Sequence, residues 1–379
     1  MPGRRRYRMG RKTSYYPMLV KKAELTNYRN YESLGVAFSP GTNLLFGDNG
    51  QGKTNLLEAI YLCATTASHR GKKEKELIAF NKEEAHIRLL VEKRGVESRL
   101  DFHISREKGK SAALEGVPLP RIAAILGQLH VVFFSPEDLQ IIKRDPEERR
   151  RFLNLEMCQL SPAYTADLME YKKLLQNRNA LLKDIREKGS ERSLLNIYDE
   201  KLAEAGESLM KARAEFLKEL EEIIRPIHYA LSGGKEELSL RYQRGAPEGQ
   251  MAEKLFLSRD RDLALGSTSL GPHRDEIGFF INERGLKQFG SQGQQRTAAL
   301  ALKLGEIEMV RRKIGESPVL LLDDVLSELD SGRQEKLLSS LQNMQTILTC
   351  TGLEDWVKGS LPVEKKWRVR EGTLTEEDT

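Results

Sequence analysis

A glycine-rich segment near the start of this chain has the residue types and spacing that hold the phosphates of a nucleotide. It consists of Gly47, Asp48, Asn49, Gly50, Gln51, Gly52, Lys53 and Thr54. Its glycines let backbone N–H groups surround phosphates without interference from a Cβ, and its lysine ammonium can reach the β- and γ-phosphates. The Thr54 hydroxyl is a suitable Mg²⁺ ligand. The segment therefore predicts a nucleotide site that uses Mg²⁺.

Two adjacent carboxylates far along the chain, Asp323 and Asp324, suggest the second half of that site. They follow the wholly apolar run 319–322. A strand buried on both faces has this composition, and functional groups emerge at the carboxyl ends of such strands in doubly wound sheets. We expect Asp323 to hold Mg²⁺, directly or through water, and Asp324 to orient or deprotonate the attacking water. Together with Lys53 these are the predicted catalytic residues.

Apolar patterns around these segments predict the elements that position them. The glycine-rich loop follows the strand-like run 42–46 and precedes a helix-like run, which is the context that such a site requires. Apolar and polar residues alternate at 84–93 and 96–105, on either side of Arg94-Gly95, and predict an antiparallel hairpin. These features indicate a mixed α/β head.

The middle of the chain changes to long, charged, helical sequence. Apolar residues between 195 and 227 recur at alternating steps of three and four, which is the seam of a two-helix coiled arrangement. A second apolar stripe spans 168–185, and residues 187–190 can turn between the two. We predict an antiparallel helical hairpin whose helix of ~35 residues gives an arm of roughly 50 Å. An ordinary helical bundle packed on the head is the alternative that this pattern leaves open.

These patterns divide the chain into four segments of an α/β protein, a head into which a short antiparallel helical arm is inserted. Residues 1–17 are predicted to be a basic, disordered extension, 18–135 the first part of the head, 136–265 the arm domain, and 266–379 the rest of the head. The extension has six basic residues and no acidic one, and the remainder has 55 basic and 56 acidic side chains. Overall charge therefore says nothing about partners.

A third segment, 289–296, places Ser291, Gly293 and Gln294 just before a good helix. Together with the carboxylates and an acidic loop at 327–330, it resembles the heads of ABC-type ATPases. In that family the serine–glycine signature of one subunit closes over the γ-phosphate that its partner holds. The resemblance therefore implies that these three residues contact ATP bound by a second copy, so that ATP joins two copies face to face.

The long interval between the phosphate loop and the carboxylates, with a helical arm inside it, resembles the SMC-type branch of that class. Six segments in this order are similar to the RecF family of recombination mediators: 25–31, 47–54, 134–139, 148–153, 271–275 and 322–330. The resemblance implies a DNA-binding protein that uses ATP and Mg²⁺, dimerises on ATP, and acts as a weak, DNA-stimulated ATPase switch. It also implies work with RecR and RecO to load RecA at single-strand gaps. The processes implied are DNA repair, replication restart and the SOS response, in the cytoplasm at the nucleoid.

Several residues depart from the general ABC pattern. The signature reads Ser-Gln-Gly-Gln-Gln instead of Leu-Ser-Gly-Gly-Gln, Asp324 is one methylene shorter than the usual glutamate, and no switch histidine occurs around Thr349 to Thr351. These departures favour a slow switch over a fast motor.

Local clusters of basic residues are the candidates for DNA contact, because Lys and Arg neutralise phosphates. The predicted set is Arg70, Lys72, Lys73, Arg144, Arg149 and Arg150. Each cluster is equally consistent with a solvated surface run, and residues 149–151 could instead pair with acidic groups inside the head. No base-reading motif occurs, so we expect recognition of a duplex, gap or junction by shape.

Other functions are less consistent with the sequence. No apolar run approaches the ~20 residues that cross a bilayer. Cys63, Cys158 and Cys350 match no metal spacing and are predicted to be small buried side chains in a reducing cytoplasm. A transporter or motor ABC ATPase and a structural SMC-like DNA tether are the alternatives, and the tether would need much longer arms and a hinge.

Overall fold

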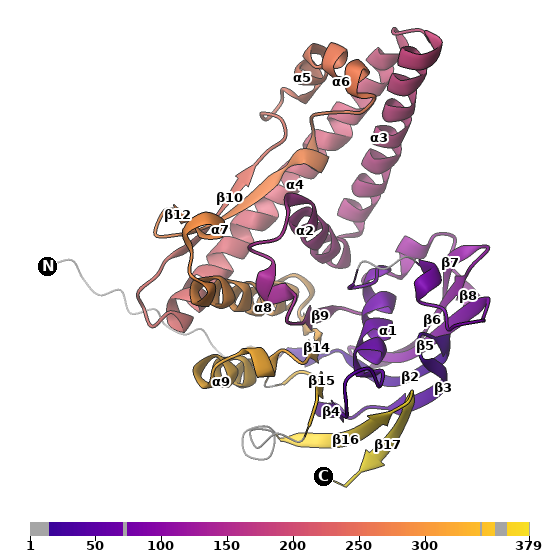
Figure 1. Ribbon diagram of the computed structural model, residues 1–379, viewed down its shortest axis with the longest axis vertical. Coiled ribbons are helices and arrows are strands. Elements are labelled where there is room, and N and C mark those ends of the chain that lie inside the picture. The colour runs from indigo at the N-terminus through magenta and orange to yellow at the C-terminus, as the bar shows by residue number, and fades with distance from the viewer. Residues whose placement is uncertain (1–14, 71–73, 342, 353–361, 379) are drawn as a thin grey trace, which may run out of the picture.

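A six-stranded, mostly parallel sheet forms the centre of the head in the computed structural model, which describes residues 15–70, 74–341, 343–352 and 362–378 (Figure 1). Its strand order is β17-β16-β4-β15-β14-β9. Five strands are parallel and β17 is antiparallel. The strands are β9 (Val131–Phe134), β14 (Val319–Asp323), β15 (Thr346–Cys350), β4 (Thr42–Phe46), β16 (Val363–Arg370) and β17 (Thr373–Glu377). Strand β4, from the start of the chain, thus lies between strands from its end.

Successive residues of the central strands face opposite sides of this sheet, because side chains alternate along a strand. Leu44 and Phe46 belong to the core that includes α8 (Gln292–Ile314). Leu45 belongs to the core that includes α1 (Lys53–Thr65). The sheet therefore separates α1 from α8 (Figure 1).

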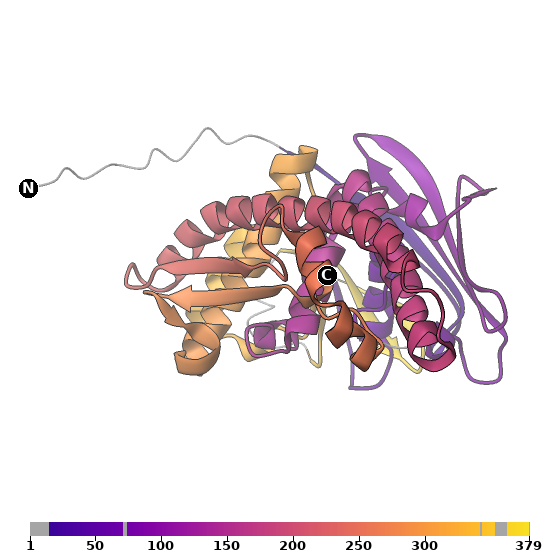
Figure 2. The same cartoon turned by 90° about the horizontal axis from the view of Figure 1, so that it is seen from above.

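A second, antiparallel sheet of order β3-β2-β5-β6-β7-β8 shares a hydrophobic core with α1, at the side of the head away from β10 and β11 (Figure 2). The predicted hairpin is confirmed, because β5 and β6 pair from Glu84↔Ser105 to Lys93↔Val96. Arg94 and Gly95 join them with φ of 52° and 75°, the left-handed backbone that a two-residue hairpin turn requires. The strands are β2 (Leu19–Tyr28), β3 (Tyr31–Ala37), β5 (Glu84–Lys93), β6 (Val96–Ser105), β7 (Gly109–Leu114) and β8 (Val117–Pro118).

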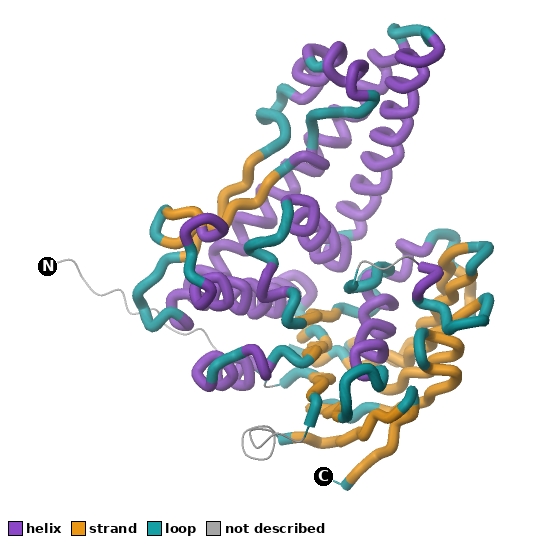
Figure 3. Tube along the Cα trace, in the orientation of Figure 1, coloured by secondary structure: helices purple, strands orange, loops and turns teal. Residues whose placement is uncertain are grey.

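The arm is a helical hairpin that rises from the head (Figure 3). It pairs α3 (Pro162–Lys188) with the 38-residue α4 (Leu194–Leu231). The Ser161 hydroxyl accepts a hydrogen bond from Tyr164 N at the start of α3, and Gly189 ends that helix in the left-handed conformation. In α4 the apolar stripe is buried at Leu195, Leu202, Leu209, Phe216 and Ile223.

The base of the arm is packed against the head. A Cβ added to Gly305 of α8 would lie 2.3 Å from Cγ2 of Ile224 on α4, so the two helices touch closely. β10 (Leu238–Gln243) pairs with β11 (Glu276–Ile281) in an antiparallel sheet. The inserted segment is therefore packed on the head at its base, and α6 covers the hairpin near its tip, where Leu263 joins the core of Leu182, Ile185 and Leu195.

Shorter elements complete the described chain. The helices are α2 (Pro146–Leu160), α5 (Met251–Leu257), α6 (Arg259–Leu265), α7 (Leu286–Phe289) and α9 (Ser331–Ser340). The short strands are β1 (Tyr16–Pro17), β12 (Arg284–Gly285) and β13 (Glu316–Ser317). Single 3₁₀ turns occupy Glu74–Glu76, Ile122–Ile125, Asp138–Gln140, Pro272–Arg274 and Leu326–Glu328.

The beginning of the chain needs one correction. Tyr16 and Pro17 form β1, which pairs in parallel with β13, so these two residues belong to the head and not to the extension predicted for 1–17. Residues 1–14 lie outside the described part of the chain. Cys63 and Cys350 are buried and Cys158 is half-buried. In the described segments, no helix combines the length and the apolar character needed to cross a membrane.

Candidate nucleotide site and basic groove

The glycine-rich loop joins β4 to α1 in a backbone shape that side chains would obstruct. Gly47 and Gly52 have φ of 146° and 116°. A Cβ at Gly47 would lie 2.4 Å from the carbonyl oxygen of Val369, and one at Gly52 would lie 2.5 Å from Nδ2 of Asn30. The segment Asp48-Asn49-Gly50 forms the exposed tip of the loop. Its backbone N–H groups and the N-terminus of α1 provide the cradle for an anion.

Two turns from distant parts of the chain support this loop. In the β2–β3 turn, Asn30 Nδ2 donates to Gln51 O at 2.9 Å, and Tyr31 OH donates to Gly52 O at 2.9 Å. In the β16–β17 turn, Glu371 N donates to Gln51 Oε1 at 2.7 Å. Sequence patterns assign no role to these supports, because their distance along the chain hides the contact.

Lys53 lies at the centre of the site. Its side chain is buried, and Nζ donates to the carbonyl oxygens of Gly47 at 2.5 Å and Asp48 at 2.8 Å. Burial lowers the pKa of Lys53, while the nearby Asp324 and Asp323 carboxylates oppose that shift. The ammonium is therefore held on the loop, close to both acidic residues.

The loop meets the carboxylate strand through hydroxyl groups. Thr54 Oγ1 and Thr349 Oγ1 each donate to Asp323 Oδ1 at 2.8 Å. The backbone N–H of Asp324 donates to Thr349 Oγ1 at 3.0 Å. The hydroxyl of Thr54 and the carboxylate of Asp323 are hard oxygen donors, the set that Mg²⁺ prefers. Thr349 is the last residue but one of the neighbouring parallel strand β15, in the segment without a switch histidine, and the sequence did not single it out as a site residue.

Asp324 follows the last residue of β14 in a strained conformation. Its φ is 51°, uncommon for a residue with a Cβ and frequent at functional sites. Ser327 Oγ donates to its carbonyl oxygen at 2.7 Å. The half-buried side chain therefore leaves the sheet at a fixed angle beside Asp323.

The signature residues lie at the start of α8, across the sheet from the loop. Ser291 caps the helix: its hydroxyl accepts from Gln294 N at 3.2 Å, and Ser291 N donates to Gln294 Oε1 at 2.8 Å. Gly293 O accepts from Thr297 Oγ1 at 2.8 Å. Within the part of the chain that the structure describes, no hydrogen bond joins these residues to 47–54. The structure thus separates the signature from the loop of the same chain.

A groove of about 680 Å³ collects basic side chains between the segment that follows α1 and the start of α2. It brings together Arg70 and Arg144, and adds Lys143, which the sequence did not single out. Its lining is His69, Arg70, Glu137, Lys143, Arg144, Asp145, Glu148 and Arg151. Lys72 and Lys73 lie outside the described residues. Four Lys and Arg side chains thus line the groove beside three carboxylates, and Glu148 lies 3.3 Å from Arg144 Nη1 and 3.7 Å from Arg151 Nη1, so the groove has a small basic excess.

The structure contradicts the prediction that Arg149 contacts DNA. Its side chain is buried, and Nε donates to Glu276 Oε1 at 2.8 Å, so it pairs inside the protein as the alternative for 149–151 allows. Arg150 is half-buried and donates to the carbonyl oxygen of Asp275 at 2.8 Å, and burial lowers its pKa. These two arginines tie α2 to the β10–β11 sheet.

The segment 271–275 forms a buried hub at the base of the arm. Asp275 Oδ2 accepts from Arg213 Nη1 of α4 at 2.7 Å. His273 Nδ1 lies 2.6 Å from Tyr171 OH, and Nε2 lies 3.0 Å from Thr268 O. Burial lowers the pKa of His273 to about 4. The neutral imidazole is thus a fully bonded structural group.

Comparison with known proteins gives consistent matches. Residues 19–354 match the family described as RecF/RecN/SMC N terminal domain. The DNA replication and repair protein RecF of Lachnoclostridium phytofermentans is 50% identical over 94% of this chain and 99% of its own. That of Agathobacter rectalis is 48% identical over the same shares. A solved structure described as the recombination mediator protein RecF-ATP in the RecFOR pathway has a TM-score of 0.91 at 36% identity, covering 97% of this chain and 100% of that one.

Proposed function

This chain belongs to the RecF family, and from that premise we propose that it is an ATP-controlled recombination mediator that acts on DNA as a homodimer. One observation carries the proposal. The chain builds two anion-binding groups, the loop 47–54 and the cap of α8, on opposite faces of one sheet. Two copies related by a twofold axis would bring each loop against the other copy's cap.

The residues of the loop have separate tasks in binding ATP. The amides of 47–52 hold the phosphates, and Lys53 turns from its loop carbonyls to the β- and γ-phosphates. Thr54 and Asp323, already joined by a 2.8 Å hydrogen bond, would hold Mg²⁺. The ion, when bound, neutralises charge on the phosphates. Asp324 orients the attacking water, and its short side chain on a strained backbone favours slow hydrolysis.

The signature completes the partner's site. Ser291, Gly293 and Gln294 present the N-terminus of α8, whose partial positive charge suits a γ-phosphate. Bound ATP therefore holds two heads together, and hydrolysis releases them. ATP would therefore control when the protein binds DNA, because the two basic grooves, one from each copy, come together only in the ATP-bound dimer.

We propose that DNA binds along this groove. Arg70, Lys143 and Arg144 would contact backbone phosphates without reading bases. We place the protein at single-strand gaps and duplex junctions in the cytoplasm, where it works with RecR and RecO to load RecA. Its processes are DNA repair, replication restart and the SOS response. A passive tether is disfavoured because α4, at 38 residues, is short.

A mixing experiment tests the shared sites. Lys53→Ala removes the loop's cation, and Gly293→Arg blocks the cap. A Cβ at Gly293 meets no atom nearer than 3.8 Å, so a side chain can leave the backbone here without a clash. Each variant alone should lose hydrolysis. Equal mixing should restore part of the wild-type turnover, at most about half, because a mixed dimer carries one intact site of two.

Light scattering after gel filtration completes the test. Wild type with ATP and Mg²⁺ should elute as a dimer, and Lys53→Ala as a monomer. A mixture that stays inactive, or a wild-type protein that remains monomeric with a non-hydrolysable analogue at high concentration, would contradict the composite site. Binding of gapped DNA that ignores both ATP and Lys53 would favour the tether.

A further inference from the structure

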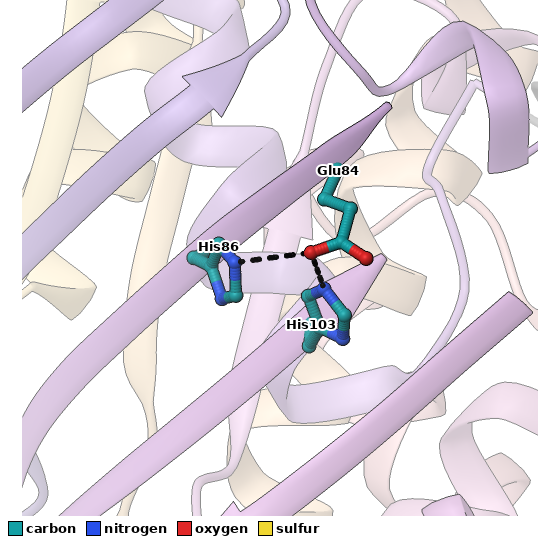
Figure 4. Close-up of side chains that lie close together, drawn as sticks. All are labelled: Glu84, His86 and His103. Atoms are coloured by element: carbon teal, nitrogen blue, oxygen red, sulfur yellow. Dashed lines mark ion pairs between the residues drawn. The ribbon is translucent and has the colours of Figure 1, made fainter. Parts of the chain in front are cut away.

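We propose that Glu84, His86 and His103 bind one divalent transition-metal ion of the zinc class, on the outer face of the antiparallel sheet (Figure 4). One ligand atom from each residue lies within 4.8 Å of the other two. Two imidazoles and one carboxylate form a donor set that zinc uses with a fourth position open. The site is separate from the loop and the carboxylates that bind nucleotide.

The sheet itself brings these side chains together. His86 of β5 and His103 of β6 are direct cross-strand partners, and Glu84 precedes His86 by two residues on the same face. Their imidazole rings stack with centroids 4.3 Å apart and an interplanar angle of 19°. The tight Arg94-Gly95 turn sets the register of the two strands, so the pair of imidazoles is fixed by the backbone.

The contacts among the three groups are close but incomplete. Glu84 Oε2 lies 3.1 Å from His103 Nε2 and 4.0 Å from His86 Nε2, so a single oxygen faces both nitrogens. His103 Nε2 is buried and makes no hydrogen bond with any described residue. A metal ion with bonds of about 2.0–2.2 Å would satisfy this nitrogen and draw the three ligand atoms to roughly 3.3 Å from one another.

The surroundings leave one side of the site open. A hollow of about 360 Å³ is lined by both histidines and by Thr26 and Ser111, their partners on the neighbouring strands. Asp101, also in the lining, accepts from Arg88 Nε at 2.7 Å and Arg99 Nε at 2.8 Å, so it is committed to arginines. The protein thus supplies three ligands, and water or an external anion takes the remaining position. The ion would cross-link β5 and β6.

Zinc titration of the full chain tests the site. The protein is treated with a chelator, dialysed, and titrated with Zn²⁺ by calorimetry without nucleotide, in millimolar Mg²⁺ to occupy hard-oxygen sites. Wild type should bind one Zn²⁺ ion. The double variant His86→Asn/His103→Asn should bind it at least ~100-fold more weakly. Glu83→Gln, a neighbouring exposed carboxylate, is the control and should bind as wild type does.

Cobalt spectroscopy supplies a second readout that stability does not affect. Co²⁺ added to wild type should give visible absorption typical of nitrogen ligation in a four- or five-coordinate site, and the double variant should not. Circular dichroism and ATP binding show that the variant is folded. Equal Zn²⁺ affinity in wild type and double variant, or a Co²⁺ spectrum unchanged by the substitutions, would overturn the site. Neither result would bear on the nucleotide site.

Discussion

Under the proposed function, Asp324 would set the rate of ATP hydrolysis. Its positive φ and the hydrogen bond from its N–H to Thr349 Oγ1 fix where the carboxylate emerges from the sheet. A carboxylate on a short side chain in a fixed backbone has little freedom to follow a moving water. General-base chemistry is therefore possible at this position but poorly adapted to speed.

Asp324→Asn separates hydrolysis from dimerisation. Asparagine tolerates the left-handed backbone but cannot accept a proton, so we expect turnover to fall by about 10²–10⁴. The ATP-bound dimer should persist and last longer. Phosphate release and light scattering measure the two effects, with Glu335→Gln on the exposed face of α9 as control. Unchanged turnover would mean that another residue is the general base for hydrolysis.

Glu156 makes stability depend on pH. Burial raises its pKa to about 7, and Lys303 only partly offsets this. Between pH ~4.5 and 7 the folded chain keeps a proton that the unfolded chain releases, so this residue's contribution to stability falls as pH rises. The free energy of unfolding of Glu156→Gln, measured relative to that of wild type, should therefore rise by up to about 3 kcal/mol between pH 5 and pH 8.

Urea unfolding of both proteins at the two pH values measures that difference. Glu147→Gln, an exposed carboxylate on the same helix, should show no such trend. A difference between Glu156→Gln and wild type that stays constant with pH would mean that the carboxyl is ionised in the fold.

The contact of α8 with α4 joins the arm to the head at the scale of elements. Gly305→Ala places a Cβ 2.3 Å from Ile224 Cγ2 and must push the helices apart. We expect a destabilisation of about 1–2 kcal/mol after the better helix propensity of alanine is included. Gly332→Ala in α9, where a Cβ meets nothing nearer than 3.6 Å, is the matched control and should be neutral or stabilising. Thermal unfolding distinguishes them.

Local patterns predicted several elements, and long-range pairing explains what they missed. The β5–β6 hairpin could be predicted because alternation and a two-residue turn are local signals. The apolar stripe of α4 could also be predicted, because its spacing of three and four residues is a local signal. By contrast, β10 pairs with β11, which follows α5 and α6 in the chain, and nothing in the sequence of 238–243 identifies that partner.

The same reason applies to the site. Thr54 and Asp323 meet as expected of groups at one edge of a parallel sheet. Thr349 and the turn at Glu371 contact the site only through the tertiary fold. Arg149 looked like a surface cation because its partner, Glu276, is 127 positions away.

At the scale of the whole molecule, the groove predicts how DNA affinity responds to salt. Replacing Arg70 and Lys143 with glutamine should lower the slope of log affinity against log salt by about 1 for each DNA phosphate that the variant no longer neutralises. Fluorescence anisotropy with gapped duplex and ATP measures this. Lys188→Gln at the far end of α3 is the control. Equal slopes in all variants would place the DNA elsewhere.

The position of β4 has a consequence for how the protein is made. Its two neighbours, β15 and β16, are translated some 300 residues after it, and the β16–β17 turn then contacts the phosphate loop. A nascent chain on the ribosome therefore carries β4 as an unpaired apolar strand until β15 and β16 have been synthesised. Any message cut short before β16 would yield a polypeptide with its glycine-rich loop fully synthesised and without the pocket around it.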